Sequence, residues 1–360
     1  MANINWWETL IGDDEQEAVL LAMKNKKIAM GELTQSLEKK ISDLLGIPYV
    51  VVCSSGSAAL YMSLIALGIG KDDEVIIPNR TYVATANAAL LAGAKVSLID
   101  VGYHDSNIDP KKIEEKITDN TKAIIPVHLN GRSADMLQIN EISQSYGIKV
   151  IEDACQSLFS KHGNKFLGTY GDIGCFSLGM TKLISTGQGG LCVTKSENTY
   201  RKLIRIRGQG LLDLNKYDIT GFGFNFKITD IQSSIGHVQF DKYKRKIDYV
   251  KKIYEVYKKG LSHLDFIDLA EISLDEGEVP LYAEVYSKKR DEIVSWLSKN
   301  GVQTQRFPPS LNRTPHLLSR DTFPNSNFFD ETSFILPCGP DQKIENVNLT
   351  ISLIEEFQQS

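Results

Sequence analysis

The chain has 360 residues, of which 42% are hydrophobic and 24% are charged, as in an ordinary soluble globular protein. This length is enough for one large domain and a smaller second one. A formal net charge of −5 argues against nucleic acid or an anionic membrane as a partner, and no apolar run is long enough to span a bilayer.

The cysteines and histidines do not form the patterns that disulfide frameworks or metal sites require. The five cysteines are scattered and include no Cys-x-x-Cys pair, and the six histidines lack the spacing of metal ligands. The sequence begins without the basic and apolar segments of a signal peptide. We therefore expect reduced thiols, no metal site and a cytoplasmic location.

Strands and helices alternate over much of the chain. Short apolar runs predict strands, whereas apolar residues three or four positions apart predict helices. In chain order, we expect helices at 15–24 and 32–45, a strand at 48–53, a helix at 58–67, a strand at 74–78, a helix at 81–92, strands at 95–100 and 121–127, a helix at 134–146, and strands at 149–152 and 191–194. This alternation predicts an α/β fold, a mainly parallel central sheet with helices on both faces.

The pattern changes after about residue 238. The expected elements there are a long charged helix at 242–259, a strand at 282–286, a helix at 288–300 and a terminal helix at 346–358. We therefore predict two domains. Residues 1–240 would form a large domain with a helical N-terminal segment, and residues 241–360 a smaller C-terminal α+β domain.

Two predicted strand-to-helix junctions carry residues suited to a flat, phosphorylated ligand. Ser55-Gly56-Ser57 follows one strand, and free N–H groups at a helix N-terminus bind phosphate well. A serine that only caps the helix is the alternative. Tyr82 follows another strand, where an aromatic ring can stack on a ligand. A tyrosine buried in the core is the alternative there.

The most specific signal is a lysine that follows a strand ending in an acid. Asp153 comes after the apolar residues Val150 and Ile151, at the expected carboxyl edge of the sheet. Lys182 follows Ser177 in a segment of small and apolar residues. A lysine in such surroundings can become a nucleophile and form a Schiff base with an aldehyde. The alternatives are an aspartate that caps a helix and a solvated loop lysine.

The order of these motifs matches what pyridoxal phosphate (PLP) chemistry requires. PLP needs a lysine for the Schiff base, an acid that keeps its pyridine nitrogen protonated, and groups that hold its phosphate. Lys182, Asp153 and Ser177 can supply these functions, and Gly187-Gln188-Gly189-Gly190 permits a tight turn after the lysine. We therefore predict a PLP enzyme in which burial lowers the pKa of Lys182.

With these motifs the chain resembles the DegT/DnrJ/EryC1/StrS family of PLP-dependent sugar aminotransferases, which have the fold-type I architecture. The resemblance runs from about residue 12 to the C-terminus. It is strongest at 55–67, 73–100, 152–156, 174–190 and 221–239. It implies that the large domain, residues 1–240, binds PLP.

The resemblance also implies a role for each candidate cofactor residue. Lys182 would form the Schiff base and act as the proton carrier, and Asp153 would contact the pyridine nitrogen. The other implied contacts are Gly56, Ser57 and Ser177 at the phosphate, Tyr82 on the ring, Gln156 near the 3-hydroxyl, and Asn225 at the phosphate in the neighbouring subunit. The last contact implies a homodimer with shared active sites.

Four positions depart from the family pattern, and they lie toward the substrate side. Gln188 stands in place of an acid, Gly179 of a histidine and Leu183 of an asparagine, and Arg207 stands where a His-Gly pair is usual. These departures leave the groups for amino transfer intact. They do not identify the sugar.

The expected reaction moves an amino group from an amino acid, with glutamate as the expected donor, to a keto-sugar. We expect the sugar to be nucleotide-linked and the amino-sugar to serve a surface polysaccharide or a secondary metabolite. The alternatives are a PLP-dependent sugar dehydratase or lyase on the same fold, or a non-catalytic paralogue. Candidate substrate contacts are Arg80, Arg207 and Arg306, with a surface arginine as the alternative for each.

Overall fold

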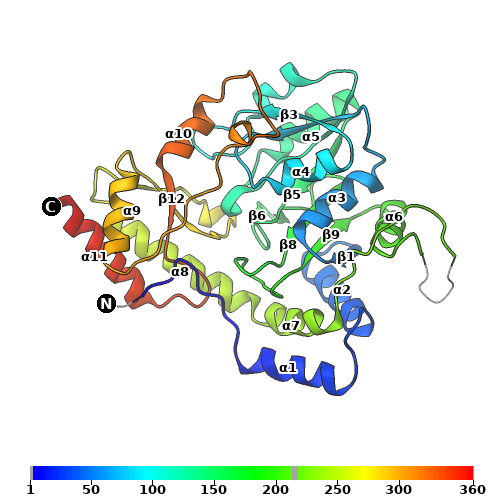
Figure 1. The fold of residues 1–360 in the computed structure, drawn as a ribbon, viewed down its shortest axis with the longest axis horizontal. Coiled ribbons are helices and arrows are strands. Elements are labelled where there is room, and N and C mark those ends of the chain that lie inside the picture. Colours follow the sequence, from blue (N-terminus) through cyan, green and yellow to red (C-terminus); the bar gives the residue numbers. More distant parts are fainter. Residues whose placement is uncertain (1–2, 213–217, 360) are drawn as a thin grey trace.

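The centre of the molecule is a seven-stranded sheet (Figure 1), in a computed structural model that describes residues 3–212 and 218–359. In spatial order its strands are β1 (Tyr49–Cys53), β9 (Gly190–Thr194), β8 (Ile173–Ser177), β5 (Lys149–Asp153), β4 (Thr121–Ile124), β2 (Glu74–Pro78) and β3 (Lys95–Ile99). The strands from β8 to β3 are parallel, whereas β9 runs antiparallel to β8 and to β1. The prediction of a mainly parallel sheet is confirmed.

Strand β8 is not among the predicted elements, because glycine and cysteine interrupt its apolar pattern. Glycine normally weakens a strand, but it also marks places where another backbone comes close. A Cβ on Gly174 would lie 1.9 Å from the carbonyl oxygen of Gly168, so no side chain fits there. Glycine at position 174 therefore allows the backbone of Gly168 to pack closely against the strand. The strand ends with Ser177 at the carboxyl edge of the sheet.

Helices cover both faces of the sheet, as expected. The helices of the larger part are α1 (Asp13–Lys24), α2 (Glu32–Leu45), α3 (Gly56–Ala66), α4 (Ala84–Leu91), α5 (Met136–Tyr146), α6 (Glu197–Arg207) and α7 (Asp230–Asp241). Helix α1 packs against α7 and lies apart from the sheet (Figure 1). Side chains alternate along β2, so Val75 and Ile77 pack with α3 and α4. Ile76 points the other way and packs with α5. Helices α6 and α7 are additions to the predicted set, and a capping box between Thr229 and Gln232 starts α7.

The region after α7 adds a smaller α+β group to one end of the sheet (Figure 1). Its elements are α8 (Tyr243–Leu261), β10 (Asp268–Leu269), β11 (Ala283–Tyr286), α9 (Arg290–Lys299), α10 (Pro324–Thr332), β12 (Ser333–Leu336) and α11 (Ile344–Gln359). Strands β10, β11 and β12 form an antiparallel sheet, and β6 (Lys161–His162) pairs with β7 (Lys165–Phe166) in a separate hairpin. The division of the chain at residue 240 stays a prediction.

Residues 4–9 connect this smaller group to the segment that precedes Lys182. Ile4 forms a β-bridge with Val302, and Trp7 forms one with Cys338. The side chains of Trp7 and Thr9 both donate hydrogen bonds to the carbonyl oxygen of Met180, at 3.2 and 2.9 Å. This N-terminal strap, residues 4–9, therefore touches both parts of the molecule.

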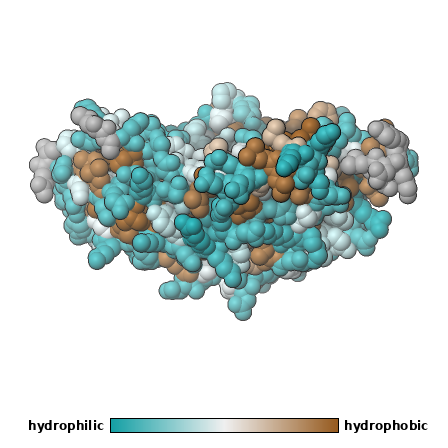
Figure 2. All heavy atoms as spheres, turned by 90° about the horizontal axis from the view of Figure 1, so that it is seen from below, coloured by the Kyte–Doolittle hydropathy of each residue, from teal (hydrophilic) through white to brown (hydrophobic). Residues whose placement is uncertain are grey.

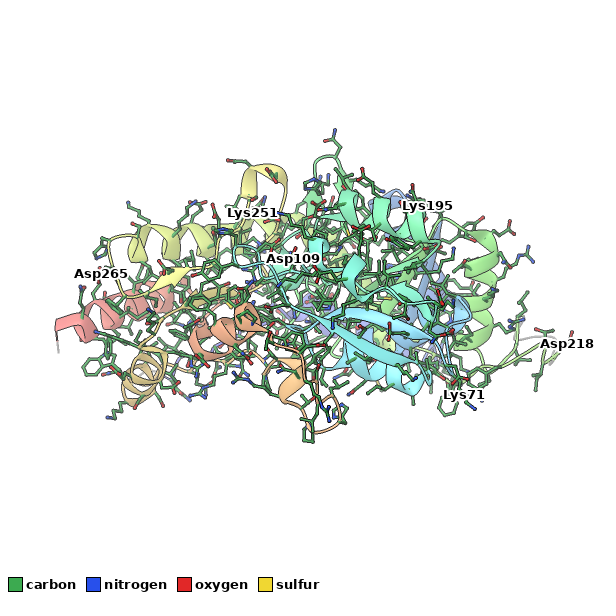
Figure 3. The ribbon with its side chains drawn as sticks, turned by 90° about the horizontal axis from the view of Figure 1, so that it is seen from above. Lys71, Asp109, Lys195, Asp218, Lys251 and Asp265 are labelled. Atoms are coloured by element: carbon green, nitrogen blue, oxygen red, sulfur yellow. The ribbon has the colours of Figure 1, made fainter. Side chains whose placement is uncertain are left out.

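The face drawn in Figure 2 is mainly hydrophilic. Charged side chains such as Lys71, Lys195 and Asp265 lie on the outside (Figure 3). Figure 2 shows one face on which apolar patches interrupt the hydrophilic surface. Within residues 3–212 and 218–359, no helix combines the length and the apolar character needed to cross a membrane.

One lysine of α8 lies inside the protein, behind the segment that carries Lys182. Lys246 is 0% exposed, and its amine donates hydrogen bonds to the carbonyl oxygen of Leu183, at 3.1 Å, and to the side chain of Gln239. Burial lowers the pKa of Lys246 to about 8, although the carboxylate of Glu15 favours the charged form. The unfolded chain would hold this proton up to its ordinary pKa of about 10.4.

This difference predicts a pH-dependent stability. Between about pH 8 and 10.4 the unfolded state binds more protons at Lys246 than the folded state, so the free energy of unfolding rises with pH. Relative to Lys246→Met, the wild type should gain about 2 kcal/mol between pH 7 and pH 10, measured by urea denaturation. The exposed Lys252→Met is the control and should show no such change. A constant difference between wild type and Lys246→Met would contradict the prediction.

Candidate active site

The carboxyl ends of the parallel strands open into a pocket of about 450 Å³. Ligands of open α/β sheets bind at this edge. Both parts of the chain line the pocket. The lining residues include Ser55, Gly56, Ser57, Tyr82, Asp153, Cys155, Gln156, Ser177, Lys182 and Gln188 from the larger part, and Tyr282, Arg306, Phe307 and Pro308 from the smaller part, with Trp6 from the strap. The structure thus brings together the candidates Gly56, Ser57, Tyr82, Asp153, Gln156, Ser177, Lys182 and Arg306.

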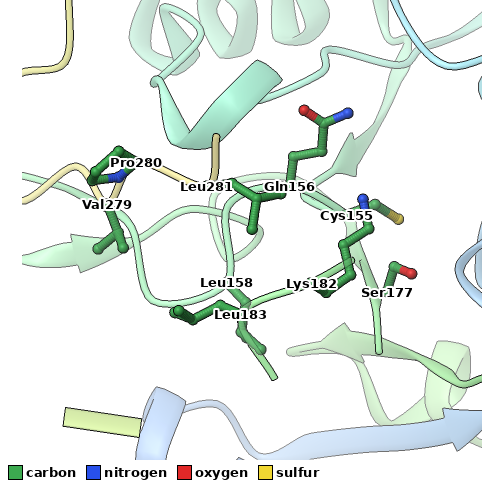
Figure 4. A pocket seen from close by; sticks show the side chains of 9 residues that line it. All are labelled: Cys155, Gln156, Leu158, Ser177, Lys182, Leu183, Val279, Pro280 and Leu281. Carbon is green, nitrogen blue, oxygen red and sulfur yellow. The ribbon is translucent and has the colours of Figure 1, made fainter. Parts of the chain in front are cut away.

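Lys182 lies in a loop that closes on itself between β8 and β9. The N–H of Leu178 donates to Gly189, and the N–H of Thr186 donates back to Leu178, at 2.8 and 3.0 Å. Figure 4 shows the Lys182 side chain beside Cys155 and Ser177 at the pocket wall. Lys182 is therefore not a solvated loop lysine, because a closed loop directs it inward.

The expected lowering of the Lys182 pKa is wrong for the free amine. Burial does disfavour the charged form, but the Tyr282 oxygen, the Cys155 sulfur and the Asp153 carboxylate favour it more. The net result raises the pKa of Lys182 above its ordinary value. The sequence could not predict this, because Tyr282 is distant in the chain.

Asp153 ends β5 and is held in place by two donors. The hydroxyl of Thr85 donates to Oδ2 at 2.7 Å, and the backbone N–H of Cys155 donates to Oδ1 at 3.2 Å. The Asp153 side chain is buried, and turns rather than a helix follow it at residues 154–160. The alternative that Asp153 caps a helix is therefore wrong. Its carboxylate is fixed at the pocket wall.

The first turn of α3 lines the pocket as well. Ser55 caps the helix, since its hydroxyl accepts a hydrogen bond from the N–H of Ala58 at 3.1 Å. Gly56 has no room for a side chain, because an added Cβ would lie 2.8 Å from Sγ of Cys155 and 3.0 Å from Cβ of Ser177. The capping role of Ser55 thus leaves Gly56 and Ser57 to face the pocket with free backbone donors, as a phosphate site needs.

Two further candidates lie at the pocket with different partners. Tyr82 is 57% exposed, so the alternative of a core tyrosine is wrong. Gln156 accepts a hydrogen bond from the backbone N–H of Asn130 at 2.9 Å through its side-chain oxygen. Tyr82 is therefore free to stack on a ligand, whereas Gln156 is oriented by Asn130.

The candidate arginines differ in position. Arg306 lines the pocket and forms an ion pair with Asp291 at 2.8 Å. Arg80 is buried, pairs with Glu284 at 2.5 Å and lies against the rings of Phe307 and Phe329.

Arg207 is also buried, where it pairs with Glu38 and donates to the carbonyl oxygen of Val52 at 2.8 Å. The structure does not bring Arg80 or Arg207 to the pocket wall. Neither of them is a surface arginine.

Asn225 does not line the pocket of its own chain. Its side chain is exposed, and its oxygen accepts a hydrogen bond from the N–H of Lys227 at 3.4 Å. The segment around it forms a β-bridge between Asn225 and Gly208. A contact from Asn225 to the site of a neighbouring subunit stays a prediction.

Sequence reasoning missed Trp6, Tyr282 and Phe307. They come from three separate segments, and only the adjacent tryptophans Trp6 and Trp7 give any local signal. Tyr282 lies 5.6 Å from Trp7, 6.1 Å from Trp6 and 6.2 Å from Phe307 between ring centroids. Trp6, Tyr282 and Phe307 give the pocket an apolar wall.

The residues present fit pyridoxal phosphate. Lys182 offers an amine, Asp153 offers a buried carboxylate, and Gly56 and Ser57 line the pocket at the first turn of α3, where an anion can bind. Within the described ranges, no group of three or more histidine, cysteine or acidic side chains could hold a metal ion.

Known proteins resemble the chain over most of its length. GDP-perosamine synthase of Caulobacter vibrioides is 32% identical, with 81% of each chain covered. The 3-oxo-glucose-6-phosphate:glutamate aminotransferase of Bacillus subtilis is 34% identical, over 85% of this chain and 70% of the relative.

A solved structure shows the same fold with its cofactor bound. The crystal structure of NtdA from Bacillus subtilis with PMP has a TM-score of 0.90 and 30% identity, over 97% of this chain and 83% of that one. The sequence pattern of the DegT/DnrJ/EryC1/StrS aminotransferases matches residues 9–355. The chain belongs to this PLP-dependent family.

Proposed function

We propose that this enzyme transfers an amino group from glutamate to a nucleotide-linked keto-sugar. The observation that carries the proposal is the pocket itself, where Lys182, Asp153 and the first turn of α3 converge. The names of relatives support a phosphorylated sugar, because they specify a GDP-linked sugar, a UDP-linked sugar or a sugar phosphate. The product would serve a surface polysaccharide or a secondary metabolite, and the enzyme would act in the cytoplasm.

The residues that line the pocket would hold the cofactor at its phosphate and at its ring. When bound, pyridoxal phosphate supplies an aldehyde that accepts an amine and a ring that withdraws electrons. Gly56, Ser57 and Ser177 would hold the phosphate, Tyr82 would cover the ring, and Gln156 would orient it. Asp153 would hold the proton on the ring nitrogen through a charged hydrogen bond, which would contribute about 1.5–3 kcal/mol.

Lys182 has the position of the general base and acid. Its amine, once free, takes the proton from the α-carbon of the amino-acid donor and returns a proton in the second half of the reaction. Trp6, Tyr282 and Phe307 form an apolar wall close to this amine and limit the access of water. Arg306 is the arginine placed to meet an anionic group of the sugar substrate.

A sugar dehydratase or lyase is the competing reaction, and it is not favoured. The family resemblance implies that members that dehydrate can carry a histidine in place of the lysine, whereas this chain keeps Lys182. The fold alone does not decide, since a dehydratase from E. coli with bound PLP is also similar, at 24% identity and a TM-score of 0.90. A non-catalytic role is equally disfavoured, because the amine and the carboxylate share one pocket.

The direct test uses the PLP-loaded protein and glutamate. The cofactor absorbance should change to that of the amine form as 2-oxoglutarate appears, and a keto-sugar nucleotide should then reverse the change and yield an amino-sugar. A sugar product without nitrogen would favour the dehydratase. A cofactor spectrum that no amino acid changes would contradict amino transfer.

A homodimer with shared active sites is part of this proposal. Large apolar side chains are exposed around Asn225, among them Ile219, Phe222 and Phe224, each more than half exposed. Exposed aromatic residues are enriched at protein interfaces. Two-fold symmetry would place both copies of this segment at one interface, each reaching the site of the other subunit.

Replacement of Lys182 by alanine should lower turnover at least about a thousandfold, because it removes the imine partner and the proton carrier together. Activity is measured as 2-oxoglutarate release from glutamate. Circular dichroism should show an intact fold. Lys195→Ala, at an exposed position beyond β9, is the control and should keep its activity. A Lys182→Ala variant with substantial turnover would disprove the assignment.

Asp153→Asn should keep the cofactor bound but slow the glutamate half-reaction about ten- to a hundredfold, because a neutral amide cannot hold the ring nitrogen protonated. Single-turnover absorbance measurements give this rate. Asp135→Asn is a matched control, since Asp135 caps α5 and asparagine caps helices equally well. An unchanged single-turnover rate in Asp153→Asn would exclude the proposed role.

Asn225→Ala should weaken PLP affinity about tenfold, because one hydrogen bond to a charged phosphate is lost. Sedimentation should show a dimer, and dilution to monomer should release the cofactor. The experiment compares the PLP dissociation constant at high and low protein concentration. A monomer that keeps PLP and turns over would refute the shared site.

A further inference from the structure

Tyr282, immediately before β11, reaches the pocket because a single side chain holds its backbone. The side-chain oxygen of Asn130 accepts a hydrogen bond from the N–H of Tyr282 at 2.6 Å, and the side-chain nitrogen donates to its carbonyl oxygen at 3.1 Å. Both main-chain polar groups of Tyr282 are therefore fixed from the larger part of the molecule. Asn130 also donates its own N–H to Gln156.

The turn at Asn130 is built for this close approach. Asn130 has φ of +54°, a left-handed conformation that asparagine tolerates better than most residues. The next residue, Gly131, has φ of +84°, and a Cβ there would lie 1.9 Å from the carbonyl oxygen of Val279. The chain segments at 130–131 and 279–282 thus fit together only with these residue types.

The ring of Tyr282 is equally confined. It is 7% exposed and lies among Trp6, Trp7 and Phe307. A confined ring leaves the phenol oxygen one position. A Tyr282→Phe change would keep the ring contacts and remove only the hydroxyl.

The phenol oxygen lies between two groups of the Lys182 loop. Its single hydrogen points to the carbonyl oxygen of Thr181, at 3.2 Å. The oxygen lone pairs are then available to the amine of Lys182, at 3.5 Å, which must act as the donor. An acceptor in this place favours the ammonium form of the lysine over the neutral amine.

We infer that Tyr282 is a positioning residue that holds the free amine of Lys182 and favours its protonated form between the two proton transfers. This role rests on the proposed function of Lys182 as the proton carrier. It assigns a part in the reaction to the smaller part of the molecule, next to β11.

Other ionisable groups near Lys182 act in the same direction or lie farther out. Asp153, at the end of β5, and Cys155, in the turn after it, both favour the charged form of the amine. Arg306 lines the same pocket and is paired with Asp291. Tyr282 differs from them because its hydroxyl, oriented by Thr181, forms a hydrogen bond with the amine, so removal of this hydroxyl isolates one contribution.

The test uses the protein loaded with pyridoxamine phosphate, in which the amine of Lys182 is free. Trinitrobenzenesulfonate reacts with neutral amines, and mass spectrometry of the Lys182 peptide gives the modification rate from about pH 8 to about pH 10.5. In Tyr282→Phe the rate profile should shift to lower pH by about one unit, since a hydrogen bond to a charged group is lost. The glutamate half-reaction should slow about tenfold with an unchanged KM.

Tyr257→Phe is the matched control. Tyr257 is fully buried in α8, and its hydroxyl donates to the carbonyl oxygen of Pro337 at 2.9 Å, so the same atom and a similar bond are lost far from Lys182. Its rate profile should coincide with that of the wild type.

Three outcomes would contradict either the role of Tyr282 or the proposed function, and they show which of the two has failed. Identical pH profiles in wild type and Tyr282→Phe, or an equal shift in Tyr257→Phe, would disprove the role of Tyr282. A protein that binds no pyridoxamine phosphate would instead disprove the proposed function. A Tyr282→Phe variant that loses glutamate turnover but binds pyridoxamine phosphate still gives the profile, so the inference stays testable.

Discussion

The close contact between the first turn of α3 and the ends of β5 and β8 is the constraint on which the site depends. Gly56 lies so near Cys155 and Ser177 that no other residue fits without displacing them. This contact sets the distance between the helix N-terminus, which attracts an anion, and the strand ends that carry Asp153 and Ser177. The spacing of the two chemical functions is therefore set by the close packing of Gly56 against the thiol of Cys155 and against Cα and Cβ of Ser177.

A buried polar network connects the larger part of the molecule to β11 of the smaller part. Glu284 of β11 pairs with Arg80 at 2.5 Å and with Arg132 at 2.6 Å, and Asn130 contacts the same carboxylate at 3.2 Å. The two arginines keep the pKa of Glu284 below its ordinary value although burial opposes ionisation. Removal of one member would leave a buried charge without its partner, which is strongly destabilising. Arg80 thus has a structural function that explains its burial.

Local patterns predicted most of the larger part of the fold. Alternating apolar runs identified β1 to β5 and β9, because each of these strands carries its own burial signal. Strand β8 was not predicted, because a glycine at position 174 of a strand makes sense only when the nearby backbone of Gly168 is known. The motifs around Asp153 and Lys182 could be recognised in the sequence because PLP chemistry confines them to one half of the chain. The pocket positions of Tyr282, Trp6 and Phe307 could not be predicted, since these side chains come together only through contacts between distant segments.

The direction of the Lys182 pKa shift could not be predicted from the sequence either. Burial alone can be inferred from an apolar sequence context, and it predicts a lowered value. The pKa is raised instead by Tyr282 together with Cys155 and Asp153, and Tyr282 is a hundred positions away in the chain and contacts the amine only after folding. Charge interactions of this kind require the three-dimensional arrangement.

The strap formed by residues 4–9 has a consequence for the order in which the protein folds. Its partners, Val302 and Cys338, emerge from the ribosome long after the strap does. Contacts between segments so far apart form late, because the entropy of closing such a loop must be overcome first. The sheet and the first turn of α3 can assemble during synthesis, but Trp6 cannot reach its place beside Tyr282 until the strap has its partners. The pocket is therefore completed only near the end of synthesis, so a ribosome-bound intermediate would have a phosphate cradle but no closed substrate wall.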